Sequence, residues 1–316
     1  MSDLPATVHL MEVGPRDGLQ IEPKVLSRDE KLRLISAIEA AGVSEIEVGS
    51  FVNPKAVPQM ADTAEVFEAL DPKPGIIYRA LWLNARGLER AAATKNVDLE
   101  GRLHLTASEI FVKRNTNRTI DETFEQIPDW IAHYKAAGVT ADSVGIMAAF
   151  GCNFEGDVPP ARVVGLIERL GKILNAHGSK LKHASLADTM GWANPRQIKT
   201  VIGLIRDKWP DLTLRLHLHD TRGTAIANAV AALEMGVREF DGSVAGLGGC
   251  PFAGHKGAAG NICTEDLAFV CEEMGVRTNI DLDALVDAAK LAETLVGHPV
   301  PGKVMKGGLL SNLRKH

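Results

Sequence analysis

The stretch Ala41-Gly42-Val43-Ser44-Glu45-Ile46-Glu47-Val48-Gly49-Ser50 contains the pattern that decides the fold. A helical segment ends at a glycine suited to the left-handed position after a helix, and the valine leads into a strand-like run. The phrase returns as Ala137-Gly138-Val139, Met235-Gly236-Val237 and Met274-Gly275-Val276. The chain is therefore expected to pass repeatedly from helix to strand.

Outward from this stretch, apolar or β-branched runs alternate with segments whose apolar residues have helical spacing. Ser27 with Glu30 forms a capping-box pattern, and Asn194-Pro195 is typical of a helix start. Parallel strands need crossover helices, and eight strand–helix units in about 250 residues are the count of a TIM barrel. The expected strands span residues 8–13, 45–50, 77–83, 102–107, 143–150, 181–187, 213–219 and 239–245.

These elements predict a (β/α)8 TIM barrel with an added C-terminal helix. An open doubly wound sheet is less well supported, because the first strand is not followed by Gly-x-Gly-x-x-Gly. The barrel is expected over about residues 8–280, an amphipathic helix over 281–296, and a poorly ordered tail from Val300 to His316. No linker divides the sequence, so residues 1–316 are expected to form a single domain.

Composition excludes several classes of protein. The 316 residues are 45% hydrophobic and 24% charged, which is typical of a globular protein with a large core. The 35 basic and 40 acidic residues give a net charge of −5, so a broad nucleic-acid surface is not expected. We expect no membrane span, since the apolar stretches are short. Four scattered cysteines and no targeting pattern indicate a reduced, cytoplasmic protein.

Two histidines near the end of the seventh strand form the strongest candidate for a metal site. In Leu214-Arg215-Leu216-His217-Leu218-His219-Asp220, alternation turns the leucines outward and both imidazoles to the inner face. Two residues along a strand cover about 6.6 Å, so both rings can reach one cation. The alternative is a pair of hydrogen-bonded barrel histidines without a ligand.

Three charged residues lie at the expected ends of the first two strands, where TIM barrels carry their chemistry. Asp17 can supply an oxygen ligand to a cation, and Arg16 can stabilise a carboxylate or a developing enolate oxygen. Glu47 lies inside the second strand, where a carboxylate must be paired or active, and it is the candidate partner for Arg16 or for a metal-bound water. The alternatives are a turn with a surface arginine and a structural Glu–Arg pair.

Further candidates follow the later strands. Gly246-Leu247-Gly248-Gly249 precedes Cys250, which such a loop can bring to a substrate as a proton donor. Asn261 can complete a metal shell through its amide oxygen, or it can cap the next helix. Ser185 and Asp188 can bind a substrate carboxylate or a ligand histidine, although capping explains Asp188 equally well. The remaining cysteines are interpreted as structural.

Taken together, these motifs resemble the 3-hydroxy-3-methylglutaryl-CoA lyase family, which consists of metal-dependent TIM-barrel lyases with an Asp-Arg-Glu signature. The resemblance runs from about Val8 to Asp266. The motifs that carry it are Glu12-Val13-Gly14-Pro15-Arg16-Asp17-Gly18-Leu19-Gln20, Ser50-Phe51-Val52-Asn53-Pro54-Lys55, Val57-Pro58-Gln59-Met60, Ala107-Ser108-Glu109-Ile110-Phe111, Lys113-Arg114-Asn115, His217-Leu218-His219-Asp220-Thr221 and Gly246-Leu247-Gly248-Gly249-Cys250-Pro251.

The resemblance implies cleavage of 3-hydroxy-3-methylglutaryl-CoA, or a close 3-hydroxy-3-alkyl acyl-CoA, to acetyl-CoA and a 3-oxo acid such as acetoacetate, as in leucine degradation. It implies a divalent metal, Mg or Mn, with CoA as part of the substrate. A homodimer through the C-terminal helices is expected on other grounds, because residues 282–295 carry an apolar stripe. The metal ligands that the resemblance implies are Asp17, His217, His219 and Asn261. The implied catalytic residues are Arg16, Glu47, His217 and Cys250. The implied substrate-binding residues are Arg16, Gln20, Ser50, Ser185 and Asp188.

Three segments depart from the family's usual pattern: Gly254-His255-Lys256-Gly257, Trp192-Ala193 and Ala148-Ala149-Phe150. They lie around the expected mouth of the barrel and leave other acyl groups open, such as citramalyl-CoA or an isohexenylglutaryl-CoA. A condensing synthase of the same superfamily is a further alternative, against which the Gly-Gly-Cys-Pro loop argues. A metal- or CoA-binding module without catalysis is the other, and it would need neither a buried acid nor a thiol.

Overall fold

The structure, a computed structural model, describes residues 4–248 and 260–314. These residues form two compact units. The central unit comprises residues 100–239 with residues 4–5, and the terminal unit comprises 6–99, 240–248 and 260–314. Cys250 lies outside the described residues, as does the segment Gly254-His255-Lys256-Gly257. The single-domain organisation stays a prediction.

The terminal unit contains four strands in the order β3-β2-β1-β10. The β1–β2 and β2–β3 pairs are parallel, and the Val13 amide donates to the carbonyl of Gly242, the last residue of β10. The strands are β1 (His9–Glu12), β2 (Glu45–Ser50), β3 (Ile77–Leu81) and β10 (Glu239–Gly242). The helices are α1 (Arg28–Ala40), α2 (Thr63–Ala69), α3 (Ala85–Ala93), α10 (Thr264–Glu273), α11 (Leu282–Val296) and α12 (Val304–Gly307).

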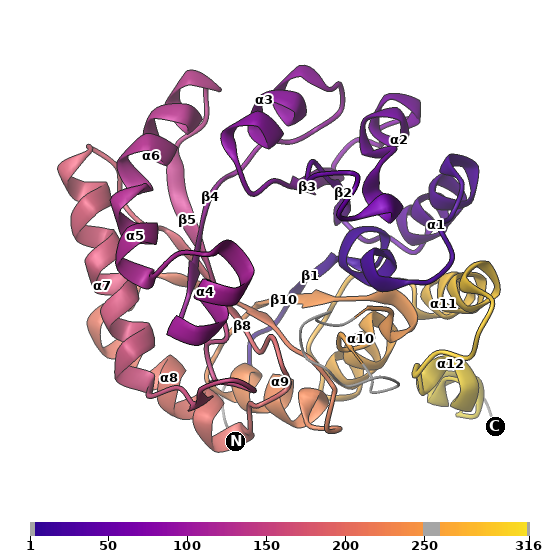
Figure 1. The fold of residues 1–316 in the computed structure, drawn as a ribbon. Helices are drawn as coiled ribbons and strands as arrows, with labels where there is room; N and C mark the ends of the chain where they lie inside the picture. The colour runs from indigo at the N-terminus through magenta and orange to yellow at the C-terminus, as the bar shows by residue number, and fades with distance from the viewer. Residues whose placement is uncertain (1–3, 249–259, 315–316) are drawn as a thin grey trace. The chain divides into compact units, whose positions relative to one another are not determined.

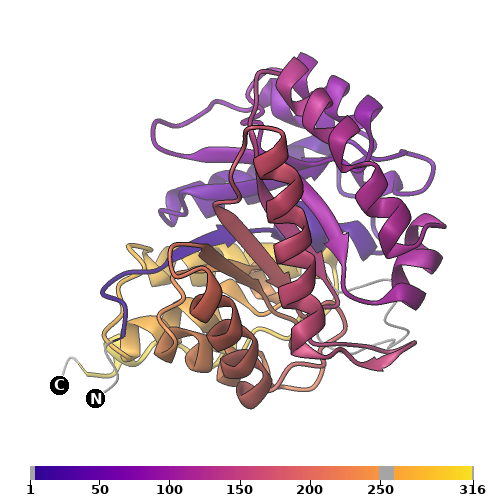
Figure 2. The ribbon, with the colours of Figure 1, turned by 90° about the vertical axis from the view of Figure 1, so that its left-hand side faces the viewer.

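The central unit contains four parallel strands in the order β4-β5-β8-β9. Its helices lie along one face of these strands (Figure 1), and Figure 2 shows them in front of the strands. The strands are β4 (Gly101–Thr106), β5 (Ala141–Met147), β8 (His183–Ala187) and β9 (Thr213–His217). The helices are α4 (Glu109–Thr116), α5 (Ile120–Glu125), α6 (Ile127–Ala136), α7 (Pro160–Ala176), α8 (Pro195–Lys208) and α9 (Ala225–Glu234).

The strands of the central unit have two chemically different faces, as the alternation predicted. Residues on the helix-covered face, such as Leu103, Ile146, Leu186 and Leu216, are at most 1% exposed. The opposite face, which we call the inner face, carries polar or small residues instead, with the exception of Met147. The expected outward direction of the leucines around His217 is therefore confirmed.

The predicted helix boundaries are confirmed at their caps. Ser27 accepts a bond from the Glu30 amide, and the Glu30 carboxylate accepts from the Ser27 amide, which completes the capping box. Asn194 accepts from the Gln197 amide in the same way at the start of α8. The glycines of the recurring phrase have positive φ, 87° at Gly42 for example, which explains why a glycine stands there.

The C-terminal segment differs from its prediction. The added helix is present as α11, but the tail after Val300 is not poorly ordered, because it forms the short helix α12. The carboxylate of Asp266 accepts the amides of Lys303 and Val304 and so fixes the start of this helix. Val304, Met305 and Leu309 are buried.

A short antiparallel pair, β6 (Gly151–Cys152) with β7 (Gly156–Asp157), follows β5 and was not predicted. Cys152 lies in this pair and is fully buried, Cys271 lies in α10, and Cys263 is the N-cap residue of α10. These positions agree with structural roles. None of the helices in residues 4–248 and 260–314 combines the length and apolarity that crossing a bilayer requires.

Candidate active site

The terminal unit holds Arg16 between two carboxylates. Arg16 and Asp17 lie in a short π-helical turn, Gly14–Gly18, directly after β1. The Nε atom of Arg16 donates to Glu47 on β2, and its Nη1 atom donates to Asp17 Oδ1 at 2.6 Å. The three side chains are only 13%, 6% and 13% exposed for Arg16, Glu47 and Asp17. The expected Arg16–Glu47 pair is therefore present.

The electrostatics of this group favour a fixed cation. Burial opposes the charge of Arg16, but attraction to Glu47 and Asp17 outweighs it and raises the pKa of the guanidinium above its usual value. Both carboxylates contact the guanidinium through different nitrogens. Arg16 is thus a permanently charged group of defined orientation, as stabilisation of a developing negative charge requires.

Asn261 completes the surroundings of Asp17. Its amide nitrogen donates to Asp17 Oδ2 at 2.7 Å and to the Leu247 carbonyl at 3.0 Å. Asn261 uses its side-chain nitrogen for both hydrogen bonds, so a cation bound by Asn261 would contact the side-chain oxygen. The sequence suggested Asn261 only as a possible ligand or cap, whereas the structure places it against Asp17.

A glycine that sequence reasoning passed over makes this approach possible. Gly248 has a φ of +89°, and a Cβ there would lie 2.6 Å from the Asp17 carbonyl oxygen and 2.9 Å from Asn261 Nδ2. Any side chain would therefore push the segment after β10 away from the turn of Asp17. The glycine-rich pattern identified a bendable loop, but only the coordinates show this close packing.

Gln20 and Ser50 also belong to the terminal unit. Gln20 is partly exposed in a 3-10 turn, Leu19–Ile21, next to the Asp17 turn. Ser50 ends β2 and is 1% exposed, and its hydroxyl has no hydrogen-bond partner among the described residues. Substrate binding by either residue stays a prediction.

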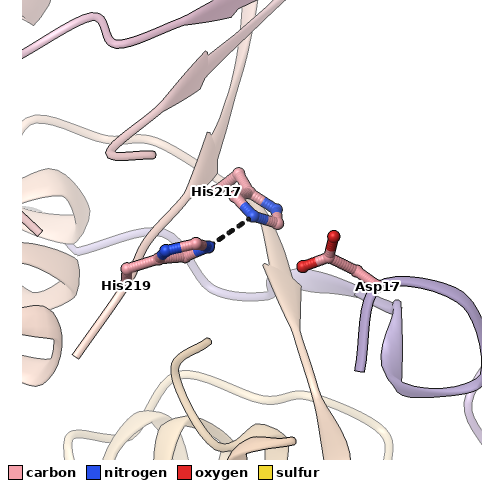
Figure 3. Close-up of side chains that lie close together, drawn as sticks. All are labelled: Asp17, His217 and His219. Carbon is pink, nitrogen blue, oxygen red and sulfur yellow. Dashed lines mark hydrogen bonds between the residues drawn. The ribbon is translucent and has the colours of Figure 1, made fainter. Parts of the chain in front are cut away.

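The central unit brings its two candidate histidines together. The Nε2 atoms of His217 and His219 lie 3.1 Å apart, and Figure 3 shows the hydrogen bond between the rings. The ring centroids are 5.1 Å apart. The expected convergence of the two imidazoles is therefore present. Neutral imidazole nitrogens so placed suit a divalent transition metal.

Asp188 organises the loop after β8. Its Oδ1 atom accepts the amides of Trp192 at 2.7 Å and Ala193 at 3.1 Å, while its own amide donates to the His217 carbonyl. Burial raises the pKa of its carboxyl to about 6, although the two amides act in the opposite direction. These bonds order the loop before α8 but do not cap the helix, because its N-cap residue is Asn194. Ser185 lies on the inner face of β8 and is partly exposed.

Two further sets of contacts were not predicted from the sequence. The buried carboxylate of Glu12 accepts from the Thr264 hydroxyl and from the amides of Gly14 and Val244. Burial raises the pKa of Glu12 to about 7. In the central unit, the Trp192 indole donates to Asn153 Oδ1 at 2.6 Å and so joins the loop after β8 to the β6–β7 turn. An acid within an apolar strand was the available signal for Glu12.

Comparison with known sequences shows the family to which the chain is related. The HMGL-like family model matches residues 7–292. Hydroxymethylglutaryl-CoA lyase YngG of Bacillus subtilis is 39% identical over 95% of this chain and 96% of its own length. The mitochondrial hydroxymethylglutaryl-CoA lyase of Homo sapiens is 38% identical over 96% and 90% of the two chains.

Comparison with solved structures points to the same family. The Bacillus subtilis HMG-CoA lyase superposes with a TM-score of 0.88 at 38% identity, covering 96% of this chain and 98% of its own. An Acinetobacter baumannii HMG-CoA lyase, solved with coenzyme A and 3-methylmalate, has a TM-score of 0.87 at 39% identity and covers 100% and 99%. The fold is thus the predicted (β/α)8 TIM barrel, and the protein is an enzyme of the carbon–carbon lyase class. The chain belongs to the HMGL-like family.

Proposed function

We propose that this lyase cleaves 3-hydroxy-3-methylglutaryl-CoA, or a close 3-hydroxy-3-alkyl acyl-CoA, to acetyl-CoA and a 3-oxo acid such as acetoacetate. The observation that carries the proposal is the buried Arg16, which Glu47 and Asp17 hold in one orientation. The names of the relatives support the same reaction. Passive binding of CoA would not require this buried charged group.

We further propose that Asp17, His217, His219 and Asn261 hold one divalent cation, Mg or Mn. The donor set fits: the terminal unit offers a carboxylate beside an amide, and the central unit offers two imidazoles whose Nε2 atoms converge. When bound, such a cation acts as a Lewis acid that lowers the pKa of the substrate's tertiary hydroxyl.

The residues of the chain then perform the proton and charge movements. A base takes the proton of the hydroxyl, and a carbonyl forms at that carbon as the bond between C2 and C3 breaks. The electron pair of this bond passes into the enolate of acetyl-CoA, whose oxygen Arg16 stabilises. An acid, Cys250 or His217, returns a proton to the enolate carbon. Glu47 keeps the guanidinium oriented throughout.

A different acyl group is the second candidate. The Acinetobacter baumannii relative was solved in complex with coenzyme A and 3-methylmalate, a hydroxy acid that is not of the glutaryl type, and this supports testing other acyl groups here. In this chain the Trp192–Asn153 pair lies directly beyond β8, next to Asp188. Citramalyl-CoA and isohexenylglutaryl-CoA therefore remain substrates to test.

A cytoplasmic location, a place in leucine degradation and a homodimer are further proposals. The apolar stripe of α11, which suggested the dimer, does not support it, because Leu285, Ala289 and Ala292 are fully buried in the chain itself. Analytical ultracentrifugation of the purified protein tests the homodimer.

A thioester panel tests the activity. The purified protein, stripped of metal and resupplied with Mg or Mn, is assayed with the three hydroxyacyl-CoA classes for release of acetyl-CoA. We expect cleavage of at least one of them. Release of free CoA from acetyl-CoA plus a 2-oxo acid would favour a synthase, and CoA binding without any cleavage would favour a binding module.

A further inference from the structure

We infer that His104, a residue given no role above, contacts a free carboxylate at the far end of the substrate's acyl chain. The inference deepens the proposed function and rests on it. Each substrate proposed above carries such a carboxylate, and the inference names the residue that receives it. Its evidence lies within the central unit alone.

The inner face of this unit is arranged in layers. The strand register aligns His104 with Gly145, Gly145 with Ser185, and Ser185 with Arg215. The next layer, toward the carboxyl ends of the strands, aligns Thr106 with Met147 and Ala187 with His217. His104 therefore lies one layer below His217, on the same face of the sheet.

The middle of the inner face, which we call the low region, has small side chains or none and is accessible. Gly145, Ser185 and Ala187 have small side chains or none, and all three are partly exposed, whereas their neighbours Ile146 and Leu186 are fully buried. The interior of a TIM barrel is ordinarily filled by bulky branched side chains. Small, exposed residues in the central strands are the exception and leave room for a ligand.

His104 stands at the edge of this low region. A Cβ at Gly145 would lie 3.6 Å from His104 Nδ1, so the imidazole borders the space that the missing side chain leaves. His104 itself is partly exposed. On the opposite edge, β9 carries His217 and, one layer below, Arg215, which pairs with Glu239 at 3.2 Å.

The ionisable residues of the two layers favour a negatively charged ligand group. Their eight positions include two histidines and no carboxylate, and the one arginine, Arg215, is already paired with Glu239. From β4 to β9 is three strand spacings, or about 14 Å between backbones. An acyl chain seated over Gly145 and Ser185 would therefore have its reacting carbons toward His217 and its far end toward His104. An imidazole N–H is a suitable donor for a terminal carboxylate.

The test compares two five-carbon thioesters that lack the 3-hydroxyl and so cannot undergo the proposed cleavage. Kd values of glutaryl-CoA and valeryl-CoA are measured by calorimetry for the wild type and for His104→Phe. We expect the wild type to bind glutaryl-CoA about tenfold more tightly, and we expect this preference to disappear in the variant. His177→Phe, the same change at an exposed position, is the control.

A second variant keeps the test decisive if His104→Phe does not fold. Gly145→Leu fills the low region and retains the imidazole, and we expect it to weaken binding of both thioesters about tenfold or more. An unchanged glutaryl-CoA preference in His104→Phe, or unchanged binding by Gly145→Leu, would overturn the inference alone. A wild type that binds neither thioester nor CoA would overturn the proposed function as well.

Discussion

Asn261 Nδ2 lies 2.7 Å from Asp17 Oδ2, although the two residues are 244 positions apart in the sequence. Asp17 follows the first strand, and Asn261 precedes α10, so the fold of the terminal unit creates the pair. Arg16 binds the other oxygen of the same carboxylate. Asp17 therefore has its orientation fixed from both sides, which is a property expected of a metal ligand.

This pair predicts that Asn261→Ala weakens Mn binding. The variant loses both a proposed ligand and the group that orients Asp17, so we expect the Kd for Mn to rise about 10- to 100-fold. Calorimetric titration of metal-free protein measures it. Asn175→Ala, at an exposed position in α7, is the control. Equal Mn affinity in the wild type and Asn261→Ala would remove Asn261 from the site.

The Arg16–Glu47 pair predicts a loss of turnover in Arg16→Lys. Lysine keeps the charge but cannot contact Glu47 and Asp17 through separate, fixed nitrogens. We expect kcat to fall about 100-fold or more with a small change in the melting temperature. Steady-state kinetics with the best thioester of the panel provide the measurement.

A matched control for this variant exists in the same unit. Arg79 pairs with Glu45 at 3.0 Å, and Glu45 lies on the same strand as Glu47, toward the amino-terminal end. That end of a barrel serves stability. We expect Arg79→Lys to lower the melting temperature while kcat stays near the wild-type value. If the two variants lowered kcat equally, the charge at Arg16 would have no special role.

Glu265 predicts an unusual pH dependence of stability. Burial raises the pKa of its carboxyl from 4.5 to about 8. Oε2 accepts the Ala245 amide, and Oε1 has no hydrogen-bond partner among the described residues. The folded state therefore holds a proton that the unfolded state releases above pH 4.5. This contribution to the free energy of unfolding is fully present below pH 4.5 and is lost as pH rises through about 8.

Glu265→Gln should remove this dependence, because glutamine stays neutral. Relative to the wild type, we expect the variant to gain stability between pH 5 and pH 8.5, by up to a few kcal/mol at about 1.4 kcal/mol per pKa unit. Thermal or urea unfolding at both pH values measures the difference. Glu89→Gln, at an exposed position of α3, is the control. A difference that is independent of pH would show that the carboxyl is ionised in the folded state.

The Trp192–Asn153 pair predicts an effect on substrate choice. Trp192→Phe removes the N–H that donates to Asn153, and Trp192→Ala removes the ring as well. We expect Trp192→Ala to change the ratio of kcat/KM between two acyl-CoA substrates about tenfold, with a smaller change in Trp192→Phe. Mn affinity should stay unchanged in both. An unchanged ratio in Trp192→Ala would place the indole outside the acyl site.

The regular part of the fold could be predicted because its signals are local. Alternation and caps located all eight barrel strands, and the parity of His217 and His219 placed both rings on one face. Contacts between distant segments could not be predicted in this way. The order of the tail depends on Asp266, 37 residues before Lys303, and two-residue strands such as Gly151–Cys152 show no periodicity.

The same distinction between local signals and contacts of distant segments applies to the candidate site. Arg16 and Glu47 were expected to pair because both end parallel strands of one barrel, and they do. The role of Gly248 against Asp17, and the partners of Glu12, depend on atoms that approach within 3 Å and have no counterpart in residue type or spacing.

Binding of Mn by single-ligand variants measures the central claim most directly. Metal-free wild type, Asp17→Asn and His219→Asn are titrated with Mn and followed by electron paramagnetic resonance, and turnover is recorded at each addition. We predict one Mn per wild-type chain, with turnover rising in proportion to occupancy, and loss of that same site in either variant. Full turnover by the metal-free wild type, or one tightly bound Mn in both variants, would contradict the proposed catalytic cation.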